Sequence, residues 1–308
     1  MAIALAMVGA VAVSFHIRIL PYAWFMITSL IDPPVVSDEA IDLARYRTDT
    51  PHGMVIDGIE GNLSGLTWVA GSDTLFAAIN DPPEVVELAT SGDLLRRMPV
   101  VGARDVEGIT HVAGDRFVLA DEGTQTLHWV EIAPDAQVID LAEAPRLHLG
   151  IDAVRNMGFE GLSWDSVDQR LVIVQEMLPL RVLEVSGIEE ALAGARLDIS
   201  VRDLQSRNGA RLFMRDLSSV TLHEKTGHLL LLSEMSAMLV EYDRQGKAIG
   251  VLDLELGGAG FERTVPQAEG VAMGKDGEIY IVSEPNLLFR LVRDKPAIWA
   301  QNTDVALP

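Results

Sequence analysis

The stretch Asp105-Val106-Glu107-Gly108-Ile109-Thr110 decides the fold, because related six-residue stretches recur along the chain. The five copies are NLSGLT at 62–67, DVEGIT at 105–110, GFEGLS at 158–163, DLSSVT at 216–221 and QAEGVA at 267–272. Their third residues are separated by 43, 53, 58 and 51 positions. Such periods match the four-stranded blades of β-propellers, and they are too long and too β-rich for ankyrin or tetratricopeptide units.

Each copy opens the same succession of strands. After GITHV at 108–112 come a tight turn, the apolar strand FVLA at 117–120 and a third strand, LHWVEI at 127–132. A more polar outer strand closes most units, as LLRRMPV does at 94–100. Continuous apolar runs suit second strands that are buried on both faces between neighbouring blades. We therefore predict an all-β fold, a β-propeller of about five four-stranded blades over residues 37–308.

The strand-like segment 45–58 precedes the first copy and has no blade of its own. We predict that it forms the outer strand of the last blade and closes the ring with the C-terminal strands. A sixth, degenerate blade is the alternative, because residues 195–215 are long enough to contain further strands. Residues 188–195 have the pattern of a short helix.

Residues 1–36 differ in composition from the rest of the chain. Two apolar runs, at 2–15 and 19–31, are separated by His16-Ile17-Arg18. A membrane-spanning helix needs about 20 apolar residues, so the two runs together are long enough. No basic residue precedes Arg18, whereas a secretory signal peptide begins with a basic region. We predict an N-terminal hydrophobic helix that acts as a membrane anchor or uncleaved signal segment, with a linker; a cleaved signal is the alternative.

Charge and composition narrow the classes of partner. The chain has 24 Lys and Arg against 45 Asp and Glu, a formal net charge of −21. Nucleic-acid binding depends on neutralising phosphates with Lys and Arg, so we predict no nucleic-acid partner. Acidic surfaces suit cations, cationic partners or solubility. The absence of cysteine excludes disulfides, thiolate metal sites and a cysteine nucleophile.

A second polar position recurs 15 or 16 residues after the third residue of each copy. The first and second strands of a blade form an antiparallel hairpin, so Glu107 and Glu122 are expected to lie roughly opposite each other. Five blades would then place ten side chains around one mouth of the central channel. These are Ser64, Glu107, Glu160, Ser218 and Glu269 from the first position and Asn80, Glu122, Glu176, Glu234 and Glu284 from the second.

Seven carboxylates in one ring repel each other, and a cation, nearby arginines or protonation must relieve the repulsion. Ca²⁺ takes six to eight oxygen ligands and tolerates irregular geometry, so a divalent cation, with Ca²⁺ as the expected ion, is predicted on the seven glutamates. Arginines in the loops before the copies could be counter-ions or could bind an anionic ligand group. The predicted ligand-binding residues are Asn80, Ser64, Ser218, Arg104, Arg155, Arg215 and Arg263. Alternatively, the repeated Glu caps backbone N–H groups of neighbouring strands and is structural.

NLSGLTW at 62–68, LFAAIND at 75–81 and the D-x-E-G-I of 105–109 resemble the SdiA-regulated (YjiK-like) proteins, over roughly residues 45–300. The resemblance implies a bacterial envelope propeller without an established activity, held at the inner (plasma) membrane by an N-terminal segment with the propeller on the periplasmic side. A looser resemblance, through the repeated Glu-Gly, is to the esterase-like phytase propellers. Ser64 and Ser218 depart from the pattern, which argues against a fully symmetric metal ring.

Three classes of function follow from these observations. The leading hypothesis is a membrane-tethered propeller that binds a cation, and with it a small ligand or a protein, at its acidic mouth. The second is a metal-assisted hydrolase of the phosphoesterase or lactonase type, with a metal-bound water as nucleophile and a ring Glu as base. The third is a metal-free protein-interaction scaffold. No lone histidine shares the phase of the ring, which favours binding over catalysis.

Overall fold

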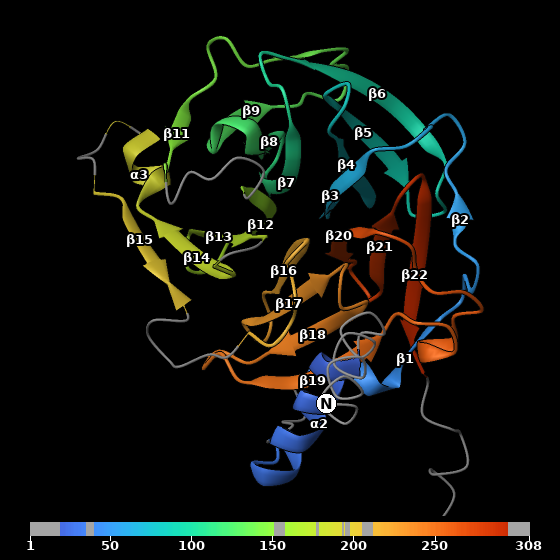
Figure 1. Cartoon of the computed structure of the whole chain (residues 1–308). Coiled ribbons are helices and arrows are strands. Elements are labelled where there is room, and N and C mark those ends of the chain that lie inside the picture. The colour runs from blue at the N-terminus through green and yellow to red at the C-terminus, as the bar shows by residue number, and fades with distance from the viewer. Residues whose placement is uncertain are drawn as a thin grey trace, which may run out of the picture.

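The computed structural model describes residues 19–34, 40–150, 158–176, 179–192, 194, 198–204 and 212–294. Within these residues five sheets stand around a central axis, and each forms one blade of a propeller (Figure 1). The prediction of a five-bladed all-β propeller is confirmed. The described part of the chain contains no sheet that could form a sixth blade. Residues 200–203, which lie in the segment considered for it, complete the third blade instead.

The first three blades are built as antiparallel meanders from the centre outward. The first contains β3 (Leu63–Val69), β4 (Thr74–Ile79), β5 (Glu84–Ala89) and β6 (Leu94–Val101), with β10 (Ile139–Asp140) parallel to β6. The second contains β7 (Val106–Ala113), β8 (Arg116–Asp121), β9 (Thr126–Glu131) and β11 (Arg146–His148). The third contains β12 (Phe159–Asp165), β13 (Arg170–Gln175), β14 (Arg181–Ser186) and β15 (Ser200–Asp203), with helix α3 (Ile188–Leu192) before β15.

The last two blades continue the ring. The fourth contains β16 (Ser219–His223), β17 (His228–Ser233), β18 (Met238–Tyr242) and β19 (Ala248–Asp253). The fifth contains β20 (Ala268–Met273), β21 (Ile279–Ser283), β22 (Leu287–Arg293) and β1 (Tyr46–Thr48), and the short β2 (Met54–Val55) also pairs with β22. Three short 3₁₀ turns lie between strands: η1 (Leu43–Arg45), η2 (Glu122–Thr124) and η3 (Gly258–Gly260).

The N-terminal strand closes the ring, as predicted. β1 pairs antiparallel with β22, with Tyr46 opposite Arg293. Just before it, the backbone N–H of Ile41 donates to the buried carboxylate of Glu241 in β18 at 3.0 Å. The segment therefore holds the last two blades together, and unfolding one end of the chain must open the ring.

Hydrophobic packing between blades accounts for the apolar second strands. All six residues of β4 are buried, and Phe76 of β4 packs with Phe117 of β8 in the core between the first two blades. Their ring centroids are 4.8 Å apart. Each second strand faces a neighbour on both sides, which explains why its apolar run is continuous rather than alternating.

The innermost strands β3, β7, β12, β16 and β20 contact one another in a closed circle around the channel. The fourth residue of the repeated stretch is the reason they come so close. A Cβ atom on Gly270 would lie 2.5 Å from the carbonyl oxygen of Ser64 and 2.6 Å from the side chain of Val282. Glycine is required here by the approach of two backbones rather than by its φ angle.

Hydroxyl groups join adjacent blades at the end of the repeated stretch. In each case a Thr or Ser oxygen accepts a backbone N–H from the innermost strand of the next blade, at 2.9 to 3.2 Å. The pairs are Thr67 with His111, Thr110 with Trp164, and Ser163 with Leu222. These bonds connect neighbouring sheets near the channel without using the repeated glutamates.

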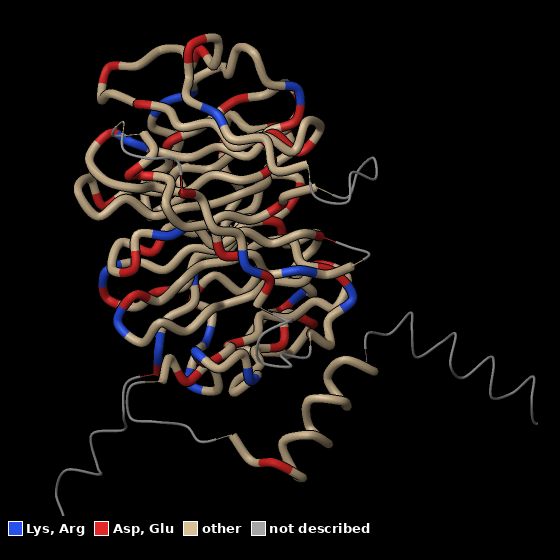
Figure 2. The backbone as a smooth tube through the Cα atoms, turned by 90° about the vertical axis from the view of Figure 1, so that its left-hand side faces the viewer, with Lys and Arg blue, Asp and Glu red and all other residues tan. Residues whose placement is uncertain are grey.

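Helix α2 (Ile19–Ile31) lies outside the ring, on the side of β19 (Figures 1 and 2). Trp24 and Phe25 stack on Phe213, with ring centroids 5.0 and 6.0 Å apart, and Asp32 pairs with Lys247 at 2.7 Å. The 13 residues of helix α2 extend about 20 Å at 1.5 Å per residue, which is shorter than a bilayer core of about 30 Å.

In the described part of the chain no helix is long and apolar enough to cross a membrane. This finding contradicts the predicted location at the inner membrane, since the 13 helical residues that the structure describes do not reach the required length. Residues 1–18 of the predicted anchor, and the predicted domain boundary at residue 36, lie outside the described residues.

We predict that Gly270→Ala lowers the free energy of unfolding by about 1–3 kcal/mol, because the new methyl group must push two inner strands apart. Gly71→Ala is the matched control, since a Cβ there meets no atom within 4 Å, and its change should stay within about 0.5 kcal/mol. Urea denaturation measures both. Equal effects of the two substitutions would show that the close approach of β20 and β3 is not needed.

Candidate functional site: a carboxylate-lined cavity

One end of the channel holds a cavity of about 240 Å³. All ten side chains expected around the mouth line it, so the geometric part of the sequence prediction agrees with the structure. Leu63 and Asp216 complete the wall. The lining carboxylates are Glu107, Glu122, Glu160, Glu176, Asp216, Glu234, Glu269 and Glu284.

A β-bulge positions each glutamate of the inner strands. In the second blade Val106 pairs with Asp121 and Gly108 with Ala120, which leaves Glu107 as the extra residue. The same shift occurs around Glu160 in β12 and around Glu269 in β20. Bulges bend a strand locally and redirect the side chain of the extra residue. The repeated stretch therefore encodes a bulge as well as a strand start.

The bulge also corrects the expected pairing of the glutamates. Glu122 does not lie opposite Glu107; its backbone N–H donates to the carbonyl oxygen of Asp105 at 2.9 Å. Glu176 and Glu284 likewise donate to Gly158 and Gln267. The second polar position therefore faces the first residue of the repeated stretch, because the extra residue of the bulge shifts the register.

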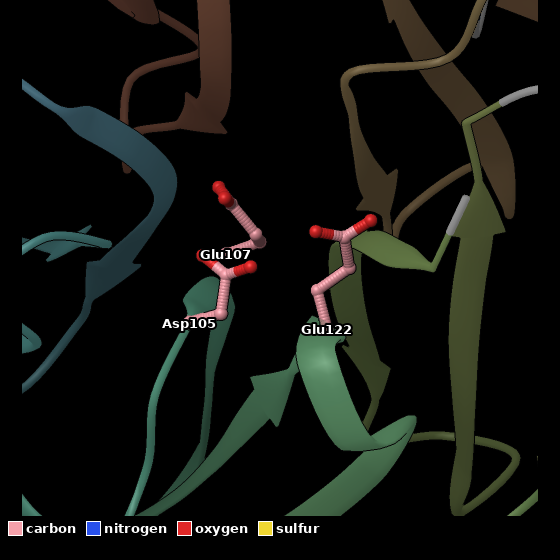
Figure 3. Close-up of side chains that lie close together, drawn as sticks. All are labelled: Asp105, Glu107 and Glu122. Carbon is pink, nitrogen blue, oxygen red and sulfur yellow. The ribbon is translucent and has the colours of Figure 1, made fainter. Parts of the chain in front are cut away.

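This register brings an overlooked residue into the site. Asp105, Glu107 and Glu122 each offer an oxygen, and these three oxygens lie within 4.8 Å of one another. Figure 3 shows the three carboxyl groups side by side at the ends of β7 and β8. Sequence reasoning placed Glu107 and Glu122 at the mouth but left out Asp105. The available signal was its place at the first position of the repeated stretch.

Asp216, the other overlooked carboxylate, has a structural role in its own blade. It is 2% exposed, and it accepts hydrogen bonds from the Ser233 hydroxyl and from the backbone N–H of Met235 at 3.0–3.1 Å. These bonds hold the turn after β17 in place, and Glu234 is the first residue of that turn. Asp216 therefore shapes the wall of the cavity, since most of its lone pairs are already used.

Hydrogen bonds hold several of the lining groups across blade boundaries. Glu107 receives the Asn80 amide at 2.8 Å and the Ser64 hydroxyl at 2.5 Å. Glu122 accepts the backbone N–H of Gly158 in the next blade at 2.9 Å. This last bond is of the kind expected if a glutamate caps a neighbouring strand, so part of the ring also joins blades.

Burial raises the pKa values of seven lining carboxyls, those of Glu107, Glu122, Glu160, Glu176, Asp216, Glu269 and Glu284. The charges of neighbouring carboxylates raise the values further for Glu107, Glu122, Glu160, Glu176 and Glu269. The pKa of Glu122 is raised to about 7, that of Glu176 to about 6 and that of Glu269 to about 8. Burial, then the charge of Glu107, raises the pKa of Glu160 well above its ordinary value. The cavity thus favours protons or cations.

The predicted arginines do not line this cavity. Arg104 and Arg263 are exposed, and Arg155 lies outside the described residues. Arg215 is half-buried, and its charge has a small lowering effect on the pKa of Asp216. Arg104 and Arg263 therefore supply no counter-ion to the cavity wall, and their role in binding an anionic ligand group stays a prediction. The raised pKa values of Glu160 and Glu269 reflect carboxylate neighbours rather than cationic ones.

The fold and cavity define a class: a five-bladed β-propeller with a carboxylate-lined cavity at one end of its channel. The sequence matches the SdiA-regulated family over residues 38–292, and the chain belongs to that family.

Solved structures share the propeller fold at low identity. One is a gluconolactonase from Xanthomonas campestris, 14% identical with a TM-score of 0.52, over 85% of this chain and 95% of that one. A calcium-binding protein, regucalcin, from Agrobacterium tumefaciens strain C58 is 12% identical with a TM-score of 0.47, over 78% of this chain and 93% of that one. At these identities the similarity to the gluconolactonase shows the fold.

The raised pKa values predict that the cation-free protein loses stability as pH rises. A carboxyl with a raised pKa binds its proton more tightly in the folded state than in the unfolded state. Between its ordinary value of 4.5 and the folded values of about 6 to 8, the folded state therefore holds more protons. The free energy of unfolding must fall with pH across this range.

Glu269→Gln removes one of the groups that must ionise. In chelator at about pH 8.5, we expect this variant to be about 1–3 kcal/mol more stable than wild type in urea denaturation, and no more stable at about pH 4, where the carboxyl is neutral in both states. Glu131→Gln, at the exposed last residue of β9, is the control and should change neither value. A gain for Glu269→Gln that is the same at both pH values would contradict the assignment.

Proposed function

We propose that the cavity binds a divalent cation, and that Ca²⁺ fits it best. The observation that carries the proposal is the convergence of eight lining carboxylates on one cavity of about 240 Å³. Carboxylates this close cannot all ionise without a compensating charge, and a cation supplies that charge. Burial and neighbouring carboxylates raise the pKa values of Glu122, Glu176 and Glu269 to about 6 to 8, so a bound cation would help these groups to ionise together at neutral pH.

The type of donor supports a hard cation. The cavity wall offers carboxylate, hydroxyl and amide groups, and no histidine or thiol lines it within the described residues. Zn²⁺ sites use nitrogen and sulfur donors in tetrahedral arrangements, whereas Ca²⁺ takes oxygens in irregular geometry. Mg²⁺ demands a tighter octahedron and keeps its water ligands. A cavity larger than one ion leaves room for waters to complete the coordination of Ca²⁺.

We place the ion where Glu107 and Glu122 of the cavity wall meet Asp105, a residue that does not itself line the cavity. Their three oxygens within 4.8 Å form the tightest group of possible ligands in the described residues. The sequence prediction of seven equivalent ligands becomes an asymmetric arrangement in the second blade. The remaining carboxylates then supply a negative field that concentrates cations at the mouth.

Adding millimolar Ca²⁺ to chelator-treated protein should raise its melting temperature by several degrees. A ligand that binds only the folded state at a hundredfold excess over Kd stabilises it by about 2.7 kcal/mol, and a domain of this size gains about 2–4 °C per kcal/mol. The double variant Asp105→Asn with Glu122→Gln should lose more than half of that shift. Calorimetric titration of the same samples gives Kd directly.

Glu131→Gln serves again as the control, and its Ca²⁺-dependent shift should equal that of the wild type. If Ca²⁺, Mg²⁺ and Mn²⁺ all leave the melting temperature of the wild type unchanged, the protein is a propeller without a cation site, and the metal-free scaffold is the better description. If the double variant keeps the full shift, the ion lies elsewhere in the ring.

A further inference from the structure

We propose that Ser64 and Asn80 are positioning residues of the cation site, which hold the Glu107 carboxylate in one orientation. The inference rests on the proposed cation binding and assigns these two residues a role other than direct contact with a ligand. It starts from an irregularity of the repeat: the first blade has no carboxylate at either of the two recurring positions.

Both donors of the first blade reach the carboxylate of the second. The Asn80 amide donates to Oε1 of Glu107 at 2.8 Å, and the Ser64 hydroxyl donates to Oε2 at 2.5 Å. Each carboxylate oxygen therefore has one fixed partner. Ser64 is 4% exposed, so water does not compete freely for its hydroxyl.

The arrangement leaves Glu107 able to bind an ion. A carboxylate has about four lone-pair sites, and the two hydrogen bonds occupy one on each oxygen. The remaining sites stay available to a cation beside Asp105 and Glu122. A carboxylate that is already oriented loses little side-chain entropy on binding, and partners behind metal ligands commonly change metal affinity 10–100-fold.

The irregularity of the first blade then has a physical reason. A glutamate at position 64 or 80 would face Glu107 with a second negative charge and without a donor. Because β3 and β7 are adjacent innermost strands, only the first blade can present donors to Glu107 from that side. The first blade has Ser64 and Asn80 in place of two carboxylates, and these two residues orient the carboxylate of Glu107 in the second blade.

Ser218 provides a matched control from the same position of the fourth blade. Its hydroxyl donates to the backbone carbonyl of Ala268 at 2.7 Å. The single proton of the Ser64 hydroxyl lies between two acceptors of Glu107, the backbone carbonyl at 2.8 Å and the carboxylate Oε2 at 2.5 Å. Alanine at either position removes the hydroxyl that bonds to the next blade, but only Ser64→Ala also removes a donor to a carboxylate of the ring.

The test is a Ca²⁺ titration by calorimetry of the full chain, with thermal unfolding in chelator as a separate readout. Ser64→Ala and Ser218→Ala should lower the melting temperature in chelator by similar amounts. Ser64→Ala should raise the Kd for Ca²⁺ about tenfold or more, whereas Ser218→Ala should change it less than about twofold. Asn80→Ala should raise Kd by a similar factor, and Ser64→Thr, which keeps the hydroxyl, should restore most of the affinity.

The outcomes separate this inference from the proposed function. If the wild type binds Ca²⁺ and Ser64→Ala and Ser218→Ala change Kd equally, Ser64 only joins blades, and the positioning role is overturned while cation binding stands. If the wild type binds none of the divalent ions, the proposed function fails and this inference fails with it. Should Ser64→Ala not fold, Asn80→Ala alone decides, because an unchanged Kd in that variant overturns the role.

Discussion

The close approach of the five innermost strands around the channel is the constraint on which the rest of the structure depends. Gly270 has no room for a Cβ against the carbonyl of Ser64, and Gly108 has none against Leu162 in the next blade. Side chains larger than hydrogen at these points would widen the ring and open the hydrophobic layers between blades. The bulge and the glycine occur together in the same short stretch, so one local motif both closes the ring and turns a side chain toward the channel.

This closure has an electrostatic cost. The same geometry that packs the inner strands gathers eight carboxylates on one small cavity, where burial and repulsion raise the pKa values of Glu160 and Glu269 among others. Hydrogen bonds from backbone N–H groups to Asp216 and Glu122 stabilise the charged form of these two carboxylates and so offset the repulsion energy in part. Neighbouring carboxylates, in addition to burial, raise the pKa values of Glu160 and Glu269. The proposed cation would offset this repulsion.

Sequence reasoning reached the blade count, the closure by β1 and the ten lining side chains, because each depends on a spacing that repeats. It failed where one residue changes the register. The bulge at Glu107 pairs Val106 with Asp121, so that Glu122 lies opposite Asp105 rather than Glu107, and Asp105 enters the group of possible ligands. It could not show that Arg104 and Arg263 lie outside the cavity wall, because the direction of a loop side chain is not set by any period. The helix at 19–31 was expected to be part of a longer span, and no described helix is long enough.

The sequence by itself determined which residues share the mouth of the channel, since in-phase positions of equivalent blades must meet at the same end of a ring. Only the tertiary structure decided how they interact. The hydrogen bonds from Ser64 and Asn80 to Glu107, and from Gly158 to Glu122, cross from one blade to the next over sequence separations of 27 to 43 residues. The spacing of a repeat specifies positions within a blade, whereas these contacts depend on the rotation and distance between blades, which the packing of the inner strands sets.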